Sequence, residues 1–295
     1  MQPSLVSVII PGYNGQAFIR EAIESALAQT YRPIEILVVD DGSPVSMAEA
    51  VSGFGPEVRY LRKENGGTAA ARNLGWRSAA GEFIALLDQD DLWLPQKLEK
   101  QVPRFGEDPA IGLVAGWMEV FDTRTGEPKG TYQPPAEMTV HDMLGYNLPP
   151  VQTMIFRRSA LEAIGGFDET MRGTDDWDVN IRVAAAYRVV SVQEVLGRAR
   201  MHSEQQGSNG EQMYRNSIRV LEKHSQIHAG CAECRQALRK SHKLVREYHS
   251  LYIKGRARAA WREGRYSAAF TKAARAFWQY PPTLTGALGR ALRGH

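Results

Sequence analysis

The sequence is poor in cysteine and has no long apolar run. Its 295 residues include two cysteines, Cys231 and Cys234, and so few thiols fit a reducing compartment better than a disulfide-stabilised secreted protein. Their C-x-x-C spacing has no second pair beside it, so a redox or metal role is not favoured. No apolar run approaches the roughly 18–20 residues that span a bilayer. The segment after Met1 becomes strand-like almost at once, which leaves no room for a signal peptide. These absences predict a cytoplasmic protein.

Acidic residues are scarce in the C-terminal third of the chain. Residues 201–295 contain 17 Lys and Arg against 6 Asp and Glu, a net charge of +11, whereas residues 1–200 carry a net charge of −8. An acidic body fits a metal-dependent site. A basic appendage fits an anionic surface such as a membrane leaflet or a nucleic acid.

Short apolar runs alternate with helical patterns in the first third of the chain. Strands are predicted at 4–10, 34–39, 58–61 and 83–87, and helices at 16–29, 45–51, 68–79 and 95–105. This alternation predicts an α/β fold with a mostly parallel, doubly wound sheet flanked by helices. Ligands bind such sheets beyond the carboxyl ends of the strands.

The pattern changes after residue 110. Strands are predicted at 111–121, 153–156, 188–192 and 197–201, helices at 140–144, 158–164 and 177–186, and a hairpin at 122–135. From about Tyr214 the sequence is helical nearly to its end. We therefore expect one domain at 1–207, divided into halves 1–110 and 111–207, and a basic helical region at 208–295.

Three carboxylates follow the strand predicted at 83–87, namely Asp88, Asp90 and Asp91. Carboxylates at close range repel one another and raise one another's pKa. A bound cation would offset this repulsion. Carboxylate oxygens are the ligands that Mg²⁺ and Mn²⁺ take, together with substrate phosphates. The alternative is a solvated acidic turn that caps the next helix, and a single D-x-D pattern does not decide between the two.

Three other segments follow predicted strands at the same edge. Tyr13, after a Pro-Gly turn, could stack on a nucleobase or be an ordinary surface residue. Asp41 could accept a hydrogen bond from a ribose hydroxyl or a base N–H, or the segment could cap the next helix. The glycines of NGGT could receive an anion at a helix start, and Arg72 and Asn73 could reach this edge or brace the sheet. This segment matches neither G-x-G-x-x-G nor a P-loop.

A second acidic cluster, Asp175, Asp176 and Asp178, lies beside a predicted helix start. Carboxylates stabilise helix N-termini, so a structural role is available to at least one of them. One could instead act as a general base while the first cluster holds a metal. His202 ends a predicted strand beside two arginines and could contact that metal or a pyrophosphate.

The order of these motifs resembles the family-2 inverting glycosyltransferases, which have the GT-A fold. The resemblance covers about residues 5–202 and rests on SVIIPGYN, QTY, EILVVDDGS, NGGTAAARN, GEFIALLDQDDLW, PQKLEKQ, GGFDE, TDDWD and RMH. It implies a metal-dependent hexosyltransferase that moves a sugar from a nucleoside-diphosphate sugar, with UDP as the expected nucleotide, to an acceptor hydroxyl. The implied acceptor is a saccharide or a lipid-linked saccharide, in cell-surface polysaccharide or glycolipid synthesis.

The resemblance also implies a role for each matching position on the donor side. Nucleotide-sugar contacts would come from Pro11, Tyr13, Asn14, Asp41, Arg72, Asn73, Asp88 and Asp91. The ligands of Mn²⁺ or Mg²⁺ would be Asp90, which binds directly, together with Asp88 and His202.

On the acceptor side, Asp176 matches the position of the catalytic base. Asp175 stands where the family more often has Glu and would lie near the acceptor. Trp177 could stack on the acceptor sugar or be an ordinary core residue. A single base suffices for an attack that displaces the diphosphate and inverts the anomeric configuration.

Two other classes compete with this interpretation. A non-catalytic nucleotide-sugar-binding or scaffold module would be supported by loss of Asp90 or Asp176, but both are present. A sugar-1-phosphate nucleotidyltransferase would carry an arginine in a glycine-rich loop near its start, whereas PGYNGQAF has none.

Residues 254–278 alternate basic with aromatic side chains. This pattern fits a helix that lies at a membrane interface, here the inner face of the cytoplasmic membrane. It equally fits a helical cap whose aromatic residues pack against the rest of the chain. A nucleic-acid partner is not expected.

Overall fold

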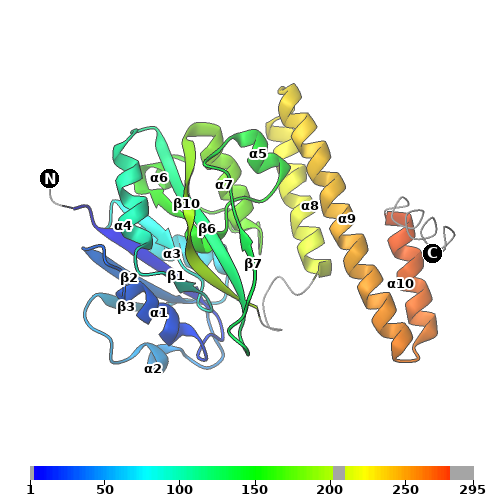
Figure 1. Ribbon diagram of the computed structural model, residues 1–295, viewed down its shortest axis with the longest axis horizontal. Helices are drawn as coiled ribbons and strands as arrows, with labels where there is room; N and C mark the ends of the chain where they lie inside the picture. The colour runs from blue at the N-terminus through cyan, green and yellow to red at the C-terminus, as the bar shows by residue number, and fades with distance from the viewer. Residues whose placement is uncertain (1–2, 202–209, 280–295) are drawn as a thin grey trace. The chain divides into compact units, whose positions relative to one another are not determined.

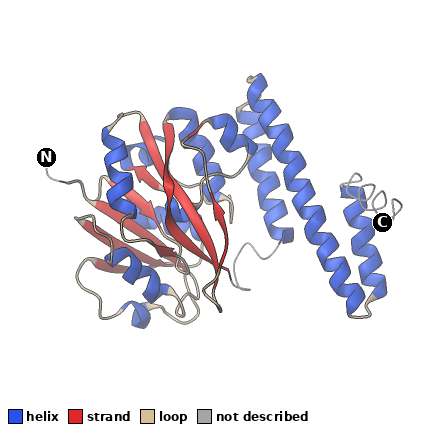
Figure 2. Cartoon of the chain, in the orientation of Figure 1, coloured by secondary structure: helices blue, strands red, loops and turns tan. Residues whose placement is uncertain are grey.

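The computed structural model describes residues 3–201 and 210–279, in two compact units, Met1–Gln205 and Gln206–His295 (Figure 1). Ten strands of the first unit form one sheet (Figure 2). Eight of them lie in the order β3 (Val58–Arg62), β2 (Ile34–Asp40), β1 (Val6–Gly12), β4 (Phe83–Leu86), β9 (Ile155–Arg157), β6 (Ile111–Asp122), β10 (Arg188–Met201) and β5 (Leu92–Trp93). Two more pair at the side, β7 (Pro128–Tyr132) with β6 and β8 (Glu137–Met138) with β10.

The sheet is mixed, as the GT-A expectation requires. Strands β3, β2, β1 and β4 are mutually parallel, and so are β6 and β10. Strand β9 is antiparallel to both of its neighbours, β4 and β6, and joins the two parallel groups. The carboxyl ends of β1, β2 and β4 therefore meet at one edge, which is where the predicted ligand-binding segments begin.

The strands predicted at 188–192 and 197–201 are a single strand, β10. Its pairing with β6 runs from Arg188 to Met201, with register shifts between Val192 and Gly197. Such irregularities leave residues unpaired and bend the strand without ending it. The local break in the apolar pattern was therefore a bulge and not a loop.

Helices flank the sheet in the first unit. They are α1 (Ile19–Leu27), α2 (Ala48–Val51), α3 (Thr68–Ser78), α4 (Lys97–Gln101), α5 (Val140–Gly145), α6 (Arg158–Ala163) and α7 (Asp175–Ala186). The helix predicted at 95–105 starts later, as α4, and continues as a 3₁₀ turn over Val102–Gly106, because Pro103 has no N–H to donate. Helix α7 starts earlier than predicted, so that Asp175 and Asp176 lie in its first turn.

The two faces of the sheet pack against different helices. Val6, Val8 and Ile10 of β1 belong to one buried cluster with Ile19 and Ile23 of α1. Successive side chains of a strand point to opposite faces, so the intervening Ile9 faces away from α1. Helix α3 lies against that second face, where the Ile9 side chain meets Gly75.

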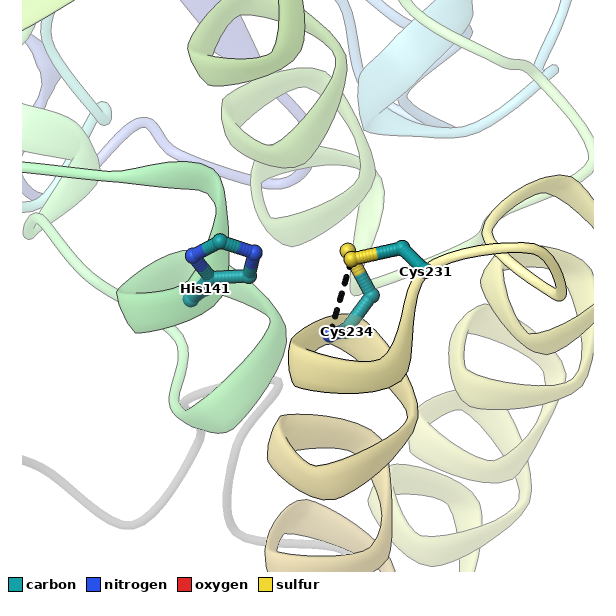
Figure 3. Close-up of side chains that lie close together, drawn as sticks. All are labelled: His141, Cys231 and Cys234. Carbon is teal, nitrogen blue, oxygen red and sulfur yellow. Dashed lines mark hydrogen bonds between the residues drawn. The ribbon is translucent and has the colours of Figure 1, made fainter.

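The second unit consists of α8 (Gly210–Ile227), α9 (Ala232–Arg262) and α10 (Tyr266–Gln279). The Sγ atom of Cys231 accepts a hydrogen bond of 3.1 Å from the backbone N–H of Cys234 and so caps α9 (Figure 3). Across residues 3–201 and 210–279, the structure contains no helix that combines the length and apolarity of a membrane span.

Gly75 allows α3 to approach the sheet closely. A Cβ atom at this position would lie 2.4 Å from the Cγ2 atom of Ile9 and 3.3 Å from that of Val39. We expect Gly75→Ala to lower the free energy of unfolding by about 1–3 kcal/mol, because the helix must shift. Gly106→Ala is the control, since no atom lies within 4 Å of its added Cβ. Equal denaturant midpoints for the two variants would contradict this packing.

Candidate active site

The first acidic cluster lies in the turn that follows β4. The backbone N–H of Asp91 donates to the carbonyl of Asp88 at 3.1 Å, which closes the turn. The Asp91 carboxylate accepts a hydrogen bond of 2.9 Å from the backbone N–H of Arg200, in β10. Asp90 lies between them and is half-buried. The turn, which leads into β5, is therefore anchored to β10, the strand that pairs with β5.

The Arg72 guanidinium joins the two acidic clusters. Its Nη2 atom donates to the Asp88 carboxylate at 2.9 Å and its Nη1 atom to Asp175 at 2.6 Å. Arg72 is 4% exposed and Asp175 is 1% exposed. Arg72 therefore positions carboxylates from α7 and from the turn after β4, and each of its Nη atoms already donates to one of them. Asp175, expected near the acceptor, is buried against Arg72.

Burial and repulsion act together on these carboxyl groups. Burial raises the pKa of Asp175 to about 6, even though the charge of Arg72 lowers it. Burial also raises the pKa of Asp88, with a further increase from the charge of Asp90. For Arg72, burial alone would lower the pKa, but Asp175 and Asp88 outweigh it and raise the pKa. The guanidinium thus stays charged and offsets part of the repulsion.

The turn after β4 has the donor set of a hard-cation site. Burial, followed by the charges of Asp90 and Asp88, raises the pKa of Asp91 well above its usual value. A divalent cation would favour the ionised forms, and its preferred ligands are carboxylate oxygens. Asp88 and Asp90 fit such a cation. His202, the third expected ligand, lies outside the described residues.

Asp176 lies near Arg72 and Asp88. Its charge raises the pKa of both Arg72 and Asp88, which shows that the two acidic clusters interact. The Asp176 carboxylate accepts hydrogen bonds from the side chain of Asn147 at 3.2 Å and from the backbone N–H of Trp177 at 2.8 Å. It is half-buried, so a carboxylate in this position can still reach a substrate hydroxyl.

The nucleoside-side residues come from β1 and β2. Pro11 is buried within β1, whereas Tyr13 is 46% exposed in the following turn. Asn14 has a left-handed φ of 53° and donates its backbone N–H to Ser43 Oγ at 3.0 Å. The turn thus presents the Tyr13 ring at the sheet edge.

Asp41 organises the loop that precedes α3. Its carboxylate accepts hydrogen bonds from the backbone N–H groups of Gly66 at 2.9 Å and Gly67 at 2.7 Å, and from Lys63 Nζ at 2.9 Å. A surface cavity of about 530 Å³ opens beside it, lined by Gly42, Arg62, Lys63, Glu64 and Asn65. Asp41 therefore fixes the loop of residues 63–67, part of which lines this cavity.

Two expected site residues are structural. The Asn73 amide donates to the Phe167 carbonyl and the Glu169 carboxylate, both at 2.8 Å, and accepts from the Phe167 N–H and from Trp76 Nε1, both at 3.0 Å. It therefore has no hydrogen-bonding capacity left for a nucleotide. Trp177, expected near the acceptor, is 3% exposed, and its indole N–H donates to the Met143 carbonyl at 2.7 Å.

Two residues with amide side chains lie at the site but belong to no sequence motif. Asn147 contacts Asp176, and the Gln152 side chain donates to Asp88 Oδ2 at 3.4 Å. Both lie in the segment between α5 and β9, where no periodic or charge pattern marks them.

Removing the Arg72 guanidinium should lower the stability of the fold and disturb the geometry of the site. Arg72→Ala leaves the buried Asp175 and the half-buried Asp88 without their cation, and we expect a loss of about 3–5 kcal/mol in the free energy of unfolding. Arg59→Ala is the control, because its ion pair with Glu35 is 46% exposed on the arginine side and is worth less than about 1 kcal/mol. Chemical denaturation measures both, and similar losses would refute the bridging role.

Comparisons with known proteins bear on the family of this chain. The family model described as "Glycosyl transferase family 2" matches residues 7–165. An uncharacterized glycosyltransferase of Rickettsia bellii is 36% identical over 213 residues, which are 68% of this chain and 30% of the relative. One from Rickettsia typhi is 34% identical over 209 residues, 68% of this chain and 65% of the relative. The chain thus spans about a third of the length of the first of these relatives.

The fold of this chain is similar to that of a solved structure. Staphylococcus aureus TarS residues 1–349, crystallised with UDP-GlcNAc, has a TM-score of 0.61 and 21% identity over 75% of this chain and 66% of that one. This likeness supports the GT-A fold of the first unit. The family-model match over residues 7–165, more than half of the chain, shows that the chain belongs to glycosyltransferase family 2.

Proposed function

We propose that this chain transfers a sugar from a nucleoside-diphosphate sugar, with UDP as the nucleotide, to an acceptor hydroxyl, with inversion at the anomeric carbon. The observation that carries this proposal is the Arg72 bridge, which joins Asp88 in the turn after β4 to Asp175, the residue next to Asp176. The TarS structure with UDP-GlcNAc supports the choice of nucleotide. A saccharide or lipid-linked saccharide is the proposed acceptor, in the synthesis of cell-surface polysaccharide or glycolipid.

Each element of the site has a task in this reaction. Tyr13 and Asp41 would hold the nucleoside at the ends of β1 and β2. Asp90, with Asp88, would hold Mn²⁺ or Mg²⁺, and the bound cation would neutralise charge that develops on the leaving diphosphate. Asp91 would lie near the donor sugar.

Asp176 would act as the general base. It would accept the proton of the acceptor hydroxyl as that oxygen forms a bond to the anomeric carbon and the bond to the diphosphate breaks. Arg72 and Asn147 would fix its position without taking part in the proton transfer. Because attack and departure occur on opposite faces, one displacement inverts the configuration.

Binding of UDP tests the donor site. We expect Mn²⁺ to strengthen UDP binding in calorimetric titrations, and Asp90→Ala to abolish that dependence because the carboxylate that would bind the cation directly is lost. Asp108→Ala is the control, since Asp108 is a partly exposed carboxylate paired with Arg188 just before β6. UDP binding that ignores Mn²⁺ would overturn the metal assignment, and no UDP binding would overturn the choice of nucleotide.

Turnover tests the base. Asp176→Asn should keep the affinity for UDP but lower the rate of sugar transfer or donor hydrolysis by about 10²–10⁴-fold, as expected for loss of a general base. Coupled UDP-release assays measure this rate. An unchanged rate would exclude Asp176, and loss of UDP affinity together with rate would place it in donor binding instead.

We also propose that the α9–α10 hairpin docks on an anionic membrane surface. Trp261, Tyr266, Phe270 and Trp278 are 59–82% exposed. Arg256, Arg258, Arg262 and Arg265 are exposed on the same hairpin. Exposed aromatic rings beside arginines are what an interfacial site requires.

Vesicle binding tests the docking surface. Arg258→Glu with Arg262→Glu should weaken sedimentation with phosphatidylglycerol vesicles and leave turnover on a soluble acceptor unchanged, because the charge lies outside the first unit. Arg239→Glu with Lys240→Glu makes the same charge change nearer the start of α9 and serves as the control. Equal binding by both double variants would refute a local docking surface.

A further inference from the structure

The middle residue of the D-x-D segment holds the turn that carries Tyr13. Gln89 Oε1 accepts a hydrogen bond of 2.9 Å from the Tyr13 N–H, and Gln89 Nε2 donates to the Tyr13 carbonyl at 3.0 Å. One side-chain amide thus pairs with both polar backbone groups of Tyr13, in the manner of a neighbouring strand. No feature of the sequence singled out Gln89.

The glycines of the PGYNG turn make room for this amide. A Cβ atom on Gly15 would lie 1.9 Å from Gln89 Oε1 and 2.4 Å from its Cδ atom, and the three atoms nearest to that Cβ all belong to the Gln89 side chain. Gly15 is buried and is not among the residues with positive φ. The small size of Gly15, and not a special backbone conformation, is therefore what the contact requires.

The turn is held from its other side as well. Asn14, in its left-handed conformation, donates to Ser43 Oγ, and the Ser43 N–H donates to Asp40 at 2.8 Å. The exposed Tyr13 is thus fixed between the segment after β2 and the turn after β4. On the β4 side the amide of Gln89 makes this connection.

We propose that Gln89 is a positioning residue that sets the nucleoside-binding turn and joins it to the carboxylates on either side of it in sequence. This inference rests on the proposed function, because it takes Tyr13 as a nucleoside contact. It goes beyond that function, because Gln89 lies between the proposed cation ligands Asp88 and Asp90 but would act on the nucleoside through the backbone of Tyr13. The pair of residues 15 and 89 forms a single unit.

A double-mutant cycle on the full chain tests this proposal. The probes are UMP in EDTA, which reports on the nucleoside side without a divalent cation, and UDP with Mn²⁺. Gln89→Ala removes two hydrogen bonds, and we expect it to weaken both ligands by about tenfold. Gly15→Ala should weaken them at least as much because its methyl group displaces the Gln89 amide. In the Gln89→Ala background, Gly15→Ala should cost almost nothing further, because the clashing atoms are gone.

The controls separate positioning from damage to the fold. Gln16→Ala removes an exposed amide that donates to the Val45 carbonyl at 2.7 Å, and it should leave both affinities unchanged. Thermal unfolding of each variant gives its stability, and the non-additive affinities should persist in every variant that stays folded at the temperature of titration. Additive effects of Gly15→Ala and Gln89→Ala would overturn the proposal, as would weaker UDP binding with unchanged UMP binding. If the wild-type chain bound neither ligand, the proposed function itself would fail.

Discussion

A buried guanidinium between two carboxylates fixes the distance between the turn after β4 and the first turn of α7. Arg72 belongs to α3, Asp88 to the turn after β4, and Asp175 to the first turn of α7. Without the positive charge, the buried carboxyl group of Asp175 would lie near the half-buried carboxyl groups of Asp88 and Asp176, and one would be protonated or the edge would open. The position of Asp176 relative to the D-x-D turn therefore depends on Arg72.

The remaining contacts extend outward from this bridge. The D-x-D turn is fixed to β10 through Asp91 and to the Tyr13 turn through Gln89. Asp41 in turn holds the glycine loop before α3, the helix that carries Arg72. Residues that would touch the nucleoside, the diphosphate and the acceptor thus belong to one hydrogen-bonded framework. A substitution at one of these positions should change the geometry at the others, because most of these residues have more than one hydrogen-bond partner.

The sequence predicted the carboxylates better than the residues that hold them. Asp41, Asp88 and Asp176 follow apolar strands or begin a helix, so their place at one edge follows from topology alone. Arg72 and Asn73 are adjacent on the same helix, and nothing in the pattern says that Arg72 bridges carboxylates whereas Asn73 closes a loop. That choice depends on tertiary contacts with residues about a hundred positions away.

Other parts of the structure escaped the sequence pattern for different reasons. Trp177 could stack on the acceptor sugar or belong to the core, and the sequence pattern does not decide; in the structure its ring is buried. Strand β10 was divided in two because a bulge interrupts its alternation. Asn147, Gln152 and Gln89 are uncharged amides, whose role is set by the groups opposite them and not by their neighbours in sequence. The alternation of strands and helices predicted a parallel α/β sheet, and the resemblance to family-2 glycosyltransferases implied the GT-A fold, whose antiparallel strand β9 the alternation alone does not indicate.

The central claim is that the carboxylates organised by Arg72 hold a divalent cation against the diphosphate of a bound nucleotide. Anomalous diffraction at the manganese edge, from crystals grown with UDP and Mn²⁺, tests it most directly. The account predicts one strong peak between the Asp90 carboxylate and the diphosphate, with Asp176 on the open side. A bound UDP with no peak there, or a manganese ion held elsewhere, would contradict it.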